Sequence, residues 1–305
     1  MRYFFSSMLL TFLSTFLVTT TIISAGLATV TSERFDEIID DIQKIYASTI
    51  KSERDLNLFI MRLGMSPNGL RDGVAIVGKR AMITISKVVA SDANITEDAF
   101  AMLVCHEFGH VLGGRPTFDK KGMIGITSVE GQADYWAAAK CFKKYATKTK
   151  MNLISQKVLE NFVSDIPDVI AKKCKKNFSQ DTYKSLICQR TAKAALSLKD
   201  YFNLNKSTND DDYVSENKVA KKTKSLTTLT TYGTNQCRFE TYLRGAYCDS
   251  DINSNSNCTV GDGVRPNCWY LGDRGEEPLR SLQMNSVIQH TDHTESLQMQ
   301  NCKQK

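Results

Sequence analysis

The 305-residue sequence has no Cys-x-x-Cys pair, no internal repeat and only four histidines. Without Cys-x-x-Cys spacing, a zinc knuckle or ribbon is disfavoured. The formal net charge of +6 is spread over many lysines. It does not form the concentrated basic face that nucleic-acid binding needs, so we expect no nucleic-acid partner. The apolar fraction of 42% and the charged fraction of 24% are ordinary for a globular protein with a sizeable core.

The N-terminal region carries no charged residue between Arg2 and Glu33. Its centre, residues 8–23, is rich in Leu, Phe, Val and Ile, and small residues dominate positions 24–28. A basic start, an apolar centre and a small-residue end predict that residues 1–28 are a signal peptide. A permanent membrane anchor is the alternative, but Ser and Thr dilute a stretch that is barely long enough to span. We therefore expect export to the periplasm or secretion, with no stable membrane insertion after cleavage.

Nine cysteines follow this segment, and an exported protein with so many is expected to form disulfides. Their spacing suggests two groups of four and a single Cys302 in a polar tail. The first group would connect helices around residues 105–110, and the second would hold a small C-terminal unit. The pairing within these groups stays open. The groups are Cys105, Cys141, Cys174 and Cys188, then Cys237, Cys248, Cys258 and Cys268.

Hydrophobic periodicity predicts a mostly helical chain with a small sheet near its start. Apolar residues between Phe35 and Tyr46 recur at helical spacing. Two short strands are expected at Gly73–Val77 and Ala81–Ser86, joined by a turn at residues 78–80. Further helical patterns cover residues 128–145 and 152–204, the latter with breaks near Pro167 and Asn177. These patterns predict a predominantly helical α+β fold with a small, largely antiparallel sheet and an irregular, disulfide-rich C-terminal part.

The best-marked helix begins after Thr96, which is a good N-cap. Ile95 and Phe100 occupy the positions of a hydrophobic staple across that cap. Acidic residues at positions 97 and 98 suit the positive end of the helix dipole. The helix should end near Gly113, with Pro116 shortly beyond.

This helix carries His106-Glu107-Phe108-Gly109-His110, an HExxH motif. Residues four apart share a helix face, so His106 and His110 can offer two imidazole nitrogens to one metal ion. Glu107 lies between them in sequence, where it can reach a water on that metal. The arrangement is the metalloprotease signature, in which zinc activates a water molecule and the glutamate acts as general base.

A second acidic pair provides the rest of a metal site. Glu130 and Asp134 lie on one face of the following helix. Glu130 is the candidate third metal ligand, because a catalytic zinc needs three protein ligands and one open position. Asp134 can accept a hydrogen bond from the second ring nitrogen of a ligating histidine, which fixes the orientation of that ring.

HExxH followed by Glu-x-x-Ala-Asp resembles the gluzincin metallopeptidases, and in particular the HtpX-like, CAAX-prenyl-protease-like and BepA-like group. The resemblance covers roughly residues 70 to 146. It implies that His106, His110 and Glu130 bind one Zn²⁺ per chain and that Glu107 is the catalytic base. It also implies that a strand before the HExxH helix pairs along its edge with extended substrate, and Ala81–Ser86 is the candidate.

Other metal-site assignments are weaker. The metzincin pattern requires a histidine three residues after Gly113, and Pro116 stands there instead. The two remaining histidines, His290 and His293, lie in a polar tail and are expected to be solvated. Cys105 is expected in a disulfide or as a buried thiol rather than as a ligand. An oxyanion donor from a later segment is also expected, and three residues are candidates: Tyr232, Arg238 and Tyr242.

The sequence therefore predicts an exported zinc endopeptidase that acts on protein or peptide substrates. A zinc-stabilised envelope binding or assembly module with little hydrolysis is the alternative. A third hypothesis is self-inhibition, in which Cys302 or the histidine-containing tail fills the open metal position. The expected organisation is a signal peptide (1–28), a zinc metallopeptidase-like domain (29–204), a linker or long loop (205–235), a Cys-rich C-terminal module (236–270) and a polar tail (271–305).

Overall fold

A computed structural model describes residues 30–64, 73–77, 79–118, 127–148, 155–202, 233–254 and 256–269. The predicted signal peptide, the polar tail and most of the predicted linker lie outside these residues, as do Tyr232, His290, His293 and Cys302. In chain order the elements are α1 (Ser32–Arg54), β1 (Asn57–Leu63), β2 (Gly73–Val77), β3 (Arg80–Ser86), α2 (Lys87–Ala90), α3 (Glu97–Leu112), α4 (Glu130–Trp136), the π-helical segment η1 (Ala137–Cys141), α5 (Phe142–Lys148), α6 (Gln156–Phe162), α7 (Asp168–Asn177), α8 (Thr182–Tyr201), α9 (Asn235–Tyr247) and the 3₁₀ turns η4 (Gly261–Gly263) and η5 (Asn267–Trp269).

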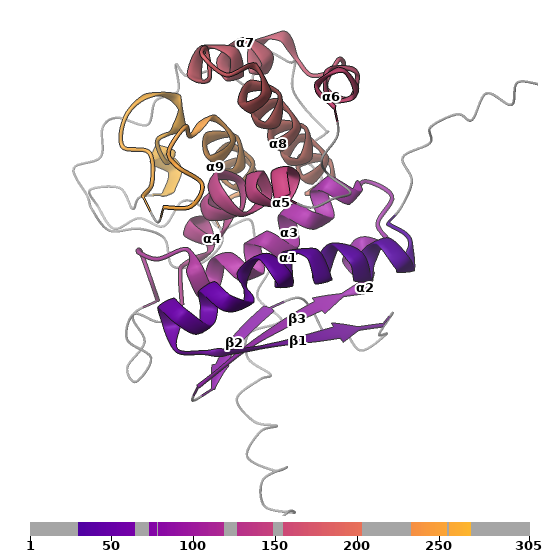
Figure 1. The fold of residues 1–305 in the computed structure, drawn as a ribbon, viewed down its shortest axis with the longest axis vertical. Coiled ribbons are helices and arrows are strands. Elements are labelled where there is room, and N and C mark those ends of the chain that lie inside the picture. The colour runs from indigo at the N-terminus through magenta and orange to yellow at the C-terminus, as the bar shows by residue number, and fades with distance from the viewer. Residues whose placement is uncertain are drawn as a thin grey trace, which may run out of the picture.

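The predicted amphipathic helix is α1, which begins after Thr31, whose side chain accepts a hydrogen bond from the backbone N–H of Arg34. It ends at Asp55, which adopts a left-handed conformation with φ 51°. One face of α1 is buried and lies along α3 and the sheet (Figure 1). The buried residues are Phe35, Ile38, Ile39, Ile42, Tyr46 and Ile50.

The sheet has three strands in the order β1-β3-β2. The expected antiparallel pair of β2 and β3 is present, with Val74 opposite Ile83. Strand β1 was not anticipated, and it pairs in parallel with β3, so the sheet is mixed. Burial alternates along β1, since Phe59 is 54% exposed while its neighbours Leu58 and Ile60 are half-buried, but residues 58–61 are all apolar, so polar and apolar residues barely alternate in the sequence. This weak alternation explains why its period-2 signal was missed.

The prediction that Ala81–Ser86 is a substrate-pairing edge is wrong. This segment is most of β3, the central strand, and its backbone is paired with β1 along its whole length on one side and with β2 over residues 81–84 on the other. A strand between two neighbours has no free row of N–H and C=O groups to offer a peptide. The side chains of Ala81, Ile83 and Ile85 are buried.

Helix α3 lies at the centre of the molecule, between the sheet and the remaining helices (Figure 1). Thr96 caps it by accepting a hydrogen bond from the N–H of Ala99, and both staple residues, Ile95 and Phe100, are buried. Phe100 stacks on Phe35 of α1 at 5.2 Å between ring centroids. Only Glu97 and Leu103 of its sixteen residues escape full burial. A helix buried all round is fixed from every side, which suits a rigid support for functional groups.

Four disulfides join the described cysteines in the two groups expected from their spacing. Cys105–Cys141 connects α3 with η1, and Cys174–Cys188 connects α7 with α8. Cys237–Cys268 and Cys248–Cys258 hold the C-terminal part. All eight sulfurs are therefore unavailable as metal ligands, and the zinc-knuckle alternative does not apply to them. Disulfides of this number are typical of an oxidising compartment.

The predominantly helical α+β class is confirmed. Breaks near Pro167 and Asn177 separate α6, α7 and α8 as expected. The helix predicted over residues 128–145 is present as α4, η1 and α5 in direct succession, and α4 packs on α3. Over the part of the chain that the structure describes, we find no helix with the length and apolar character to cross a membrane.

Candidate metal centre

The two ligand-bearing helices meet around a group of three side chains. His106 and His110 project from one face of α3, and Glu130 projects from the first turn of α4. The two Nε2 atoms lie 3.1 Å apart, and Oε2 of Glu130 lies 3.3 Å from each of them. The structure thus brings together all three residues that the sequence predicted as ligands.

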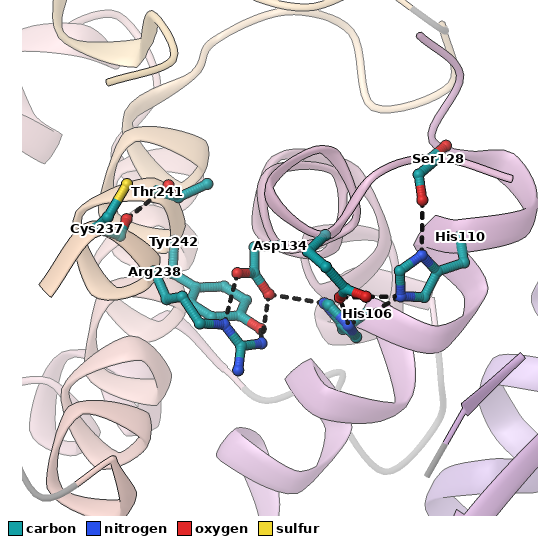
Figure 2. Close-up of polar contacts among 9 residues, drawn as sticks. His106, His110, Ser128, Asp134, Cys237, Arg238, Thr241 and Tyr242 are labelled. Carbon is teal, nitrogen blue, oxygen red and sulfur yellow. Dashed lines mark hydrogen bonds and ion pairs between the residues drawn. The ribbon is translucent and has the colours of Figure 1, made fainter. Parts of the chain in front are cut away.

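The outer ring nitrogen of each histidine faces a group that can only accept a hydrogen bond. Nδ1 of His110 lies 2.8 Å from the carbonyl oxygen of Ser128, and Nδ1 of His106 lies 2.7 Å from Oδ1 of Asp134 (Figure 2). A proton on Nδ1 of each ring is the arrangement that suits these acceptors, and it makes Nε2 the atom that can bind a metal ion. The predicted contact between Asp134 and a histidine ring is present, and Ser128 is a second anchor that the sequence did not indicate.

Lone pairs on two Nε2 atoms and one carboxylate oxygen thus converge within 3.3 Å. Such an arrangement is repulsive unless a metal ion or a proton lies among them. Ligands of a tetrahedral zinc ion lie about 3.3 Å apart when the bonds measure about 2.0 to 2.1 Å. The three distances fit one face of that tetrahedron. The group can hold one metal ion.

Glu107 is buried beside this group, 6% exposed. Its Oε2 has no hydrogen-bond partner among the described residues. Burial raises the pKa of Glu107, although His106 and His110 act in the opposite direction. A buried acceptor without a partner costs about 1–3 kcal/mol, so the position of this carboxyl group in the fold needs an explanation.

Asp134 is held in place from α9. Nε and Nη2 of Arg238 donate to its two carboxylate oxygens, each at 2.8 Å (Figure 2). Burial favours the neutral acid, but Arg238 and His106 outweigh it and lower the pKa of Asp134 to about 2. Arg238 and the buried Tyr242 were two of the candidate oxyanion donors. The structure instead places Arg238 on Asp134 and the Tyr242 hydroxyl 3.4 Å from Arg238.

The pKa of His106 shows that the surrounding carboxylates favour a positive charge in this site. Burial lowers the pKa of His106, but Asp134 and Glu130 together outweigh burial and raise it to about 10. The metal-free site therefore holds a proton at neutral pH where a metal ion would otherwise supply the positive charge. This proton contributes stability to the metal-free fold that is fully present below the ordinary histidine pKa and lost as the pH rises through about 10.

Zinc binding should therefore displace about one proton from His106 at pH 7, because metal ligands must be deprotonated. Raising the pH toward 10 removes this competition, so zinc affinity should increase by up to about tenfold per pH unit. Calorimetric titration in two buffers of different ionisation enthalpy measures the released proton directly. Identical heats in both buffers would contradict the protonated state of His106.

Gly109 is the residue that lets the two ligand helices approach. A Cβ at this position would lie 2.8 Å from the carbonyl oxygen of Ala133 and 2.9 Å from its Cα. Both neighbours are backbone atoms of α4, so the helices would have to separate. The sequence signal was a glycine in the middle of a well-formed helix, where glycine is ordinarily unfavourable.

Gly109→Ala is accordingly expected to destabilise the fold by about 1–3 kcal/mol and to weaken zinc binding, because overpacking displaces Glu130 from the histidines. In a helix without this contact the same change would stabilise the fold by about 0.4–1 kcal/mol. The sign of the change in unfolding free energy therefore shows whether the contact is present. Thermal unfolding and zinc titration measure both effects. Gly64→Ala, which lies after β1 and outside any helix, controls for the added methyl group alone, since a Cβ there meets nothing within 4 Å.

Fold and site together define a predominantly helical, disulfide-stabilised α+β protein with a His106, His110 and Glu130 group that can hold one metal ion. Comparison with protein-family models, with curated proteins and with solved structures found no match.

Proposed function

We propose that this chain is a zinc-dependent endopeptidase that acts in an oxidising, extracytoplasmic compartment. One observation carries the proposal: three atoms of the kind that bind zinc converge at 3.1 to 3.3 Å beside a buried carboxyl group, Glu107, whose Oε2 lacks a partner among the described residues. A metal ion accounts for the first feature. A water molecule or substrate at that metal accounts for the second.

The donor set favours zinc over the hard cations. Imidazole nitrogens suit zinc, whereas Ca²⁺ and Mg²⁺ take mainly oxygen ligands. Three protein ligands leave the fourth tetrahedral position open, as in catalytic sites, whereas structural zinc sites are usually closed by four. Within the described part of the chain, the metal group contains three residues and no fourth.

Each residue has a distinct chemical role in peptide hydrolysis. Glu107, with a pKa raised by burial, accepts the proton of the attacking water and returns it to the leaving amine. Asp134 and Ser128 orient His106 and His110 through their Nδ1 atoms. Zinc, when bound, supplies Lewis-acid polarisation of the scissile carbonyl and acidifies water.

A purely structural metal site explains less of the geometry. A zinc-stabilised binding module needs the two histidines and Glu130 but has no use for Glu107. Burying an unpaired carboxylate in such a module would only cost stability. The four disulfides agree with export through the predicted signal peptide at residues 1–28.

Metal analysis combined with a proteolysis assay tests the proposal. We expect the purified protein to contain about one zinc per chain, in keeping with a single group of three ligands. It should also cleave an unstructured protein such as casein. A chelator should remove both the zinc and the cleavage, and added zinc should restore them. A folded protein that takes up no zinc, or one whose chelated form cleaves casein as fast as before, would refute the proposal.

A further inference from the structure

Residues 248–254 and 256–269, here called the C-terminal cap, follow α9 and pack against α4, η1 and α5. The Tyr135 hydroxyl donates to the carbonyl of Gly263 at 2.6 Å and accepts from the N–H of Cys258 at 3.2 Å. The cap shares a small buried cluster with these helices, separate from the main core. The cluster consists of Tyr135, Ala139, Cys237, Cys248 and Trp269.

Trp269 packs directly on the residue next to a candidate metal ligand. It is 4% exposed, and its indole lies against Gly131, which follows Glu130 in the first turn of α4. A Cβ at Gly131 would overlap the indole ring, so only glycine permits this contact. The ring also meets Tyr135 edge-to-face at 6.3 Å between centroids. The cap thus packs directly on the first turn of α4.

A second contact extends from the cap to the end of α3. Nη1 of Arg265 donates to Oε1 of Gln132 at 2.8 Å, and its guanidinium lies over the Trp269 ring at 4.8 Å. Gln132 is fully buried, and its Nε2 donates to the carbonyl of Gly113 at 2.6 Å. Arg265 and Gln132 therefore connect the cap with both ligand helices, since Gly113 terminates α3 and Gln132 belongs to α4.

The first half of the cap, residues 248–254, and the second half, residues 256–269, are attached to the helices by different kinds of contact. The first half is held by buried lysines: Lys140 donates to Ser250 and to the carbonyl of Asp251, and Lys143 donates to the carbonyl of Cys248. The second half, which carries Arg265 and Trp269, is joined to the first turn of α9 by the Cys237–Cys268 disulfide. This bond ends one residue before Trp269.

We propose that the C-terminal cap is a positioning element for the metal centre, with Trp269 and Arg265 as positioning residues, and that the Cys237–Cys268 disulfide gives the centre its full metal affinity. The proposal rests on the metal site of the proposed function. Formation of the bond oxidises the two thiols to a disulfide. The two electrons and two protons pass to a second disulfide, which is reduced to two thiols. The high-affinity centre is thereby completed only after this oxidation.

Zinc affinity of Trp269→Ala tests the positioning role. We expect a loss of about 10- to 100-fold, the usual consequence of removing support from behind a metal ligand. Trp269→Phe should recover most of the affinity, because a ring again rests on Gly131. Removing the buried ring should itself destabilise the metal-free protein by about 3–5 kcal/mol, so zinc affinity is compared at a temperature where circular dichroism shows both variants folded. Wild-type affinity in Trp269→Ala would overturn the positioning role.

A double-mutant cycle makes the contact itself measurable. Gly131→Ala alone should weaken zinc binding, because its Cβ collides with the indole. In the Trp269→Ala background the collision is absent, so Gly131→Ala should have little further effect. Equal effects of Gly131→Ala in both backgrounds would show that the glycine is needed for another reason and would overturn the proposed contact.

The disulfide is tested with two matched pairs. Cys237→Ser/Cys268→Ser is expected to weaken zinc binding by about 10-fold or more, as for other supports of a metal ligand. Cys174→Ser/Cys188→Ser, which removes the α7–α8 disulfide, should leave it within about twofold of wild type. Equal losses in both pairs, or none in the first, would overturn the proposal. A wild-type protein that binds no zinc would instead overturn the proposed function and this inference with it.

Discussion

Replacing His106 with alanine is expected to abolish zinc binding. The variant keeps His110 and Glu130 but loses the ligand atom that lies 3.1 Å from one and 3.3 Å from the other. Removing support from behind a ligand already costs about 10- to 100-fold in affinity, and removing the ligand itself must cost more. Peptide hydrolysis should disappear with the metal.

Thermal unfolding in the presence of zinc measures this loss independently of activity. At a zinc concentration 100 times its Kd, binding stabilises the native state by about 2.7 kcal/mol. This increment should be present in the wild type and missing in His106→Ala. The partners of Asp134 limit the structural damage, because Arg238 continues to hold both of its carboxylate oxygens. A zinc-dependent increment that survives in His106→Ala would mean that zinc binds elsewhere.

Most of what the sequence predicted about this site has a local signal, and only the meeting of the two helices was inferred from the ligands that a zinc site requires. Thr96 and the Ile95–Phe100 staple mark where α3 begins, and helical spacing then places His106 and His110 on one face. Glu130 and Asp134 share a face of α4 for the same reason. Each of these inferences uses residues within five positions of one another, where helix geometry alone decides the outcome.

The contacts that the sequence did not predict all join distant segments. Arg238 reaches Asp134 across 104 positions, and Arg265 reaches Gln132 across 133. Packing of α9 and of the C-terminal cap decides such pairings, and no periodicity encodes them. Gly131 is an example, because the need for glycine there comes from its contact with Trp269, which lies at the other end of the described chain.

The strand order of the sheet was not predicted for a related reason. The antiparallel pairing of β2 with β3 follows from a short turn between them, which is a local feature. The parallel pairing of β1 with β3 requires a crossover, so nothing near β1 in the sequence announces it. Once β1 occupies that side, β3 becomes central, and the inference that it offers a free edge to substrate fails.

Glu107→Gln should separate catalysis from metal binding. The substitution preserves the size of a buried side chain and removes its ability to accept a proton at neutral pH. General-base catalysis contributes about 10² to 10⁴ in rate, so kcat for peptide hydrolysis should fall by that factor. Zinc content should stay at the wild-type level, because Glu107 does not belong to the three-residue metal group.

The pH profile gives Glu107→Gln a second, more specific readout. In the wild type, burial raises the pKa of Glu107, so activity should decline on the acidic side as this carboxylate takes up a proton. The residual activity of the variant should lack that acidic limb, whereas the loss of zinc on acidification should persist in both proteins. Measurements of kcat and of bound zinc on the same samples distinguish these two effects. A variant that hydrolyses peptides at the wild-type rate would remove Glu107 from the mechanism and favour a binding module stabilised by its metal.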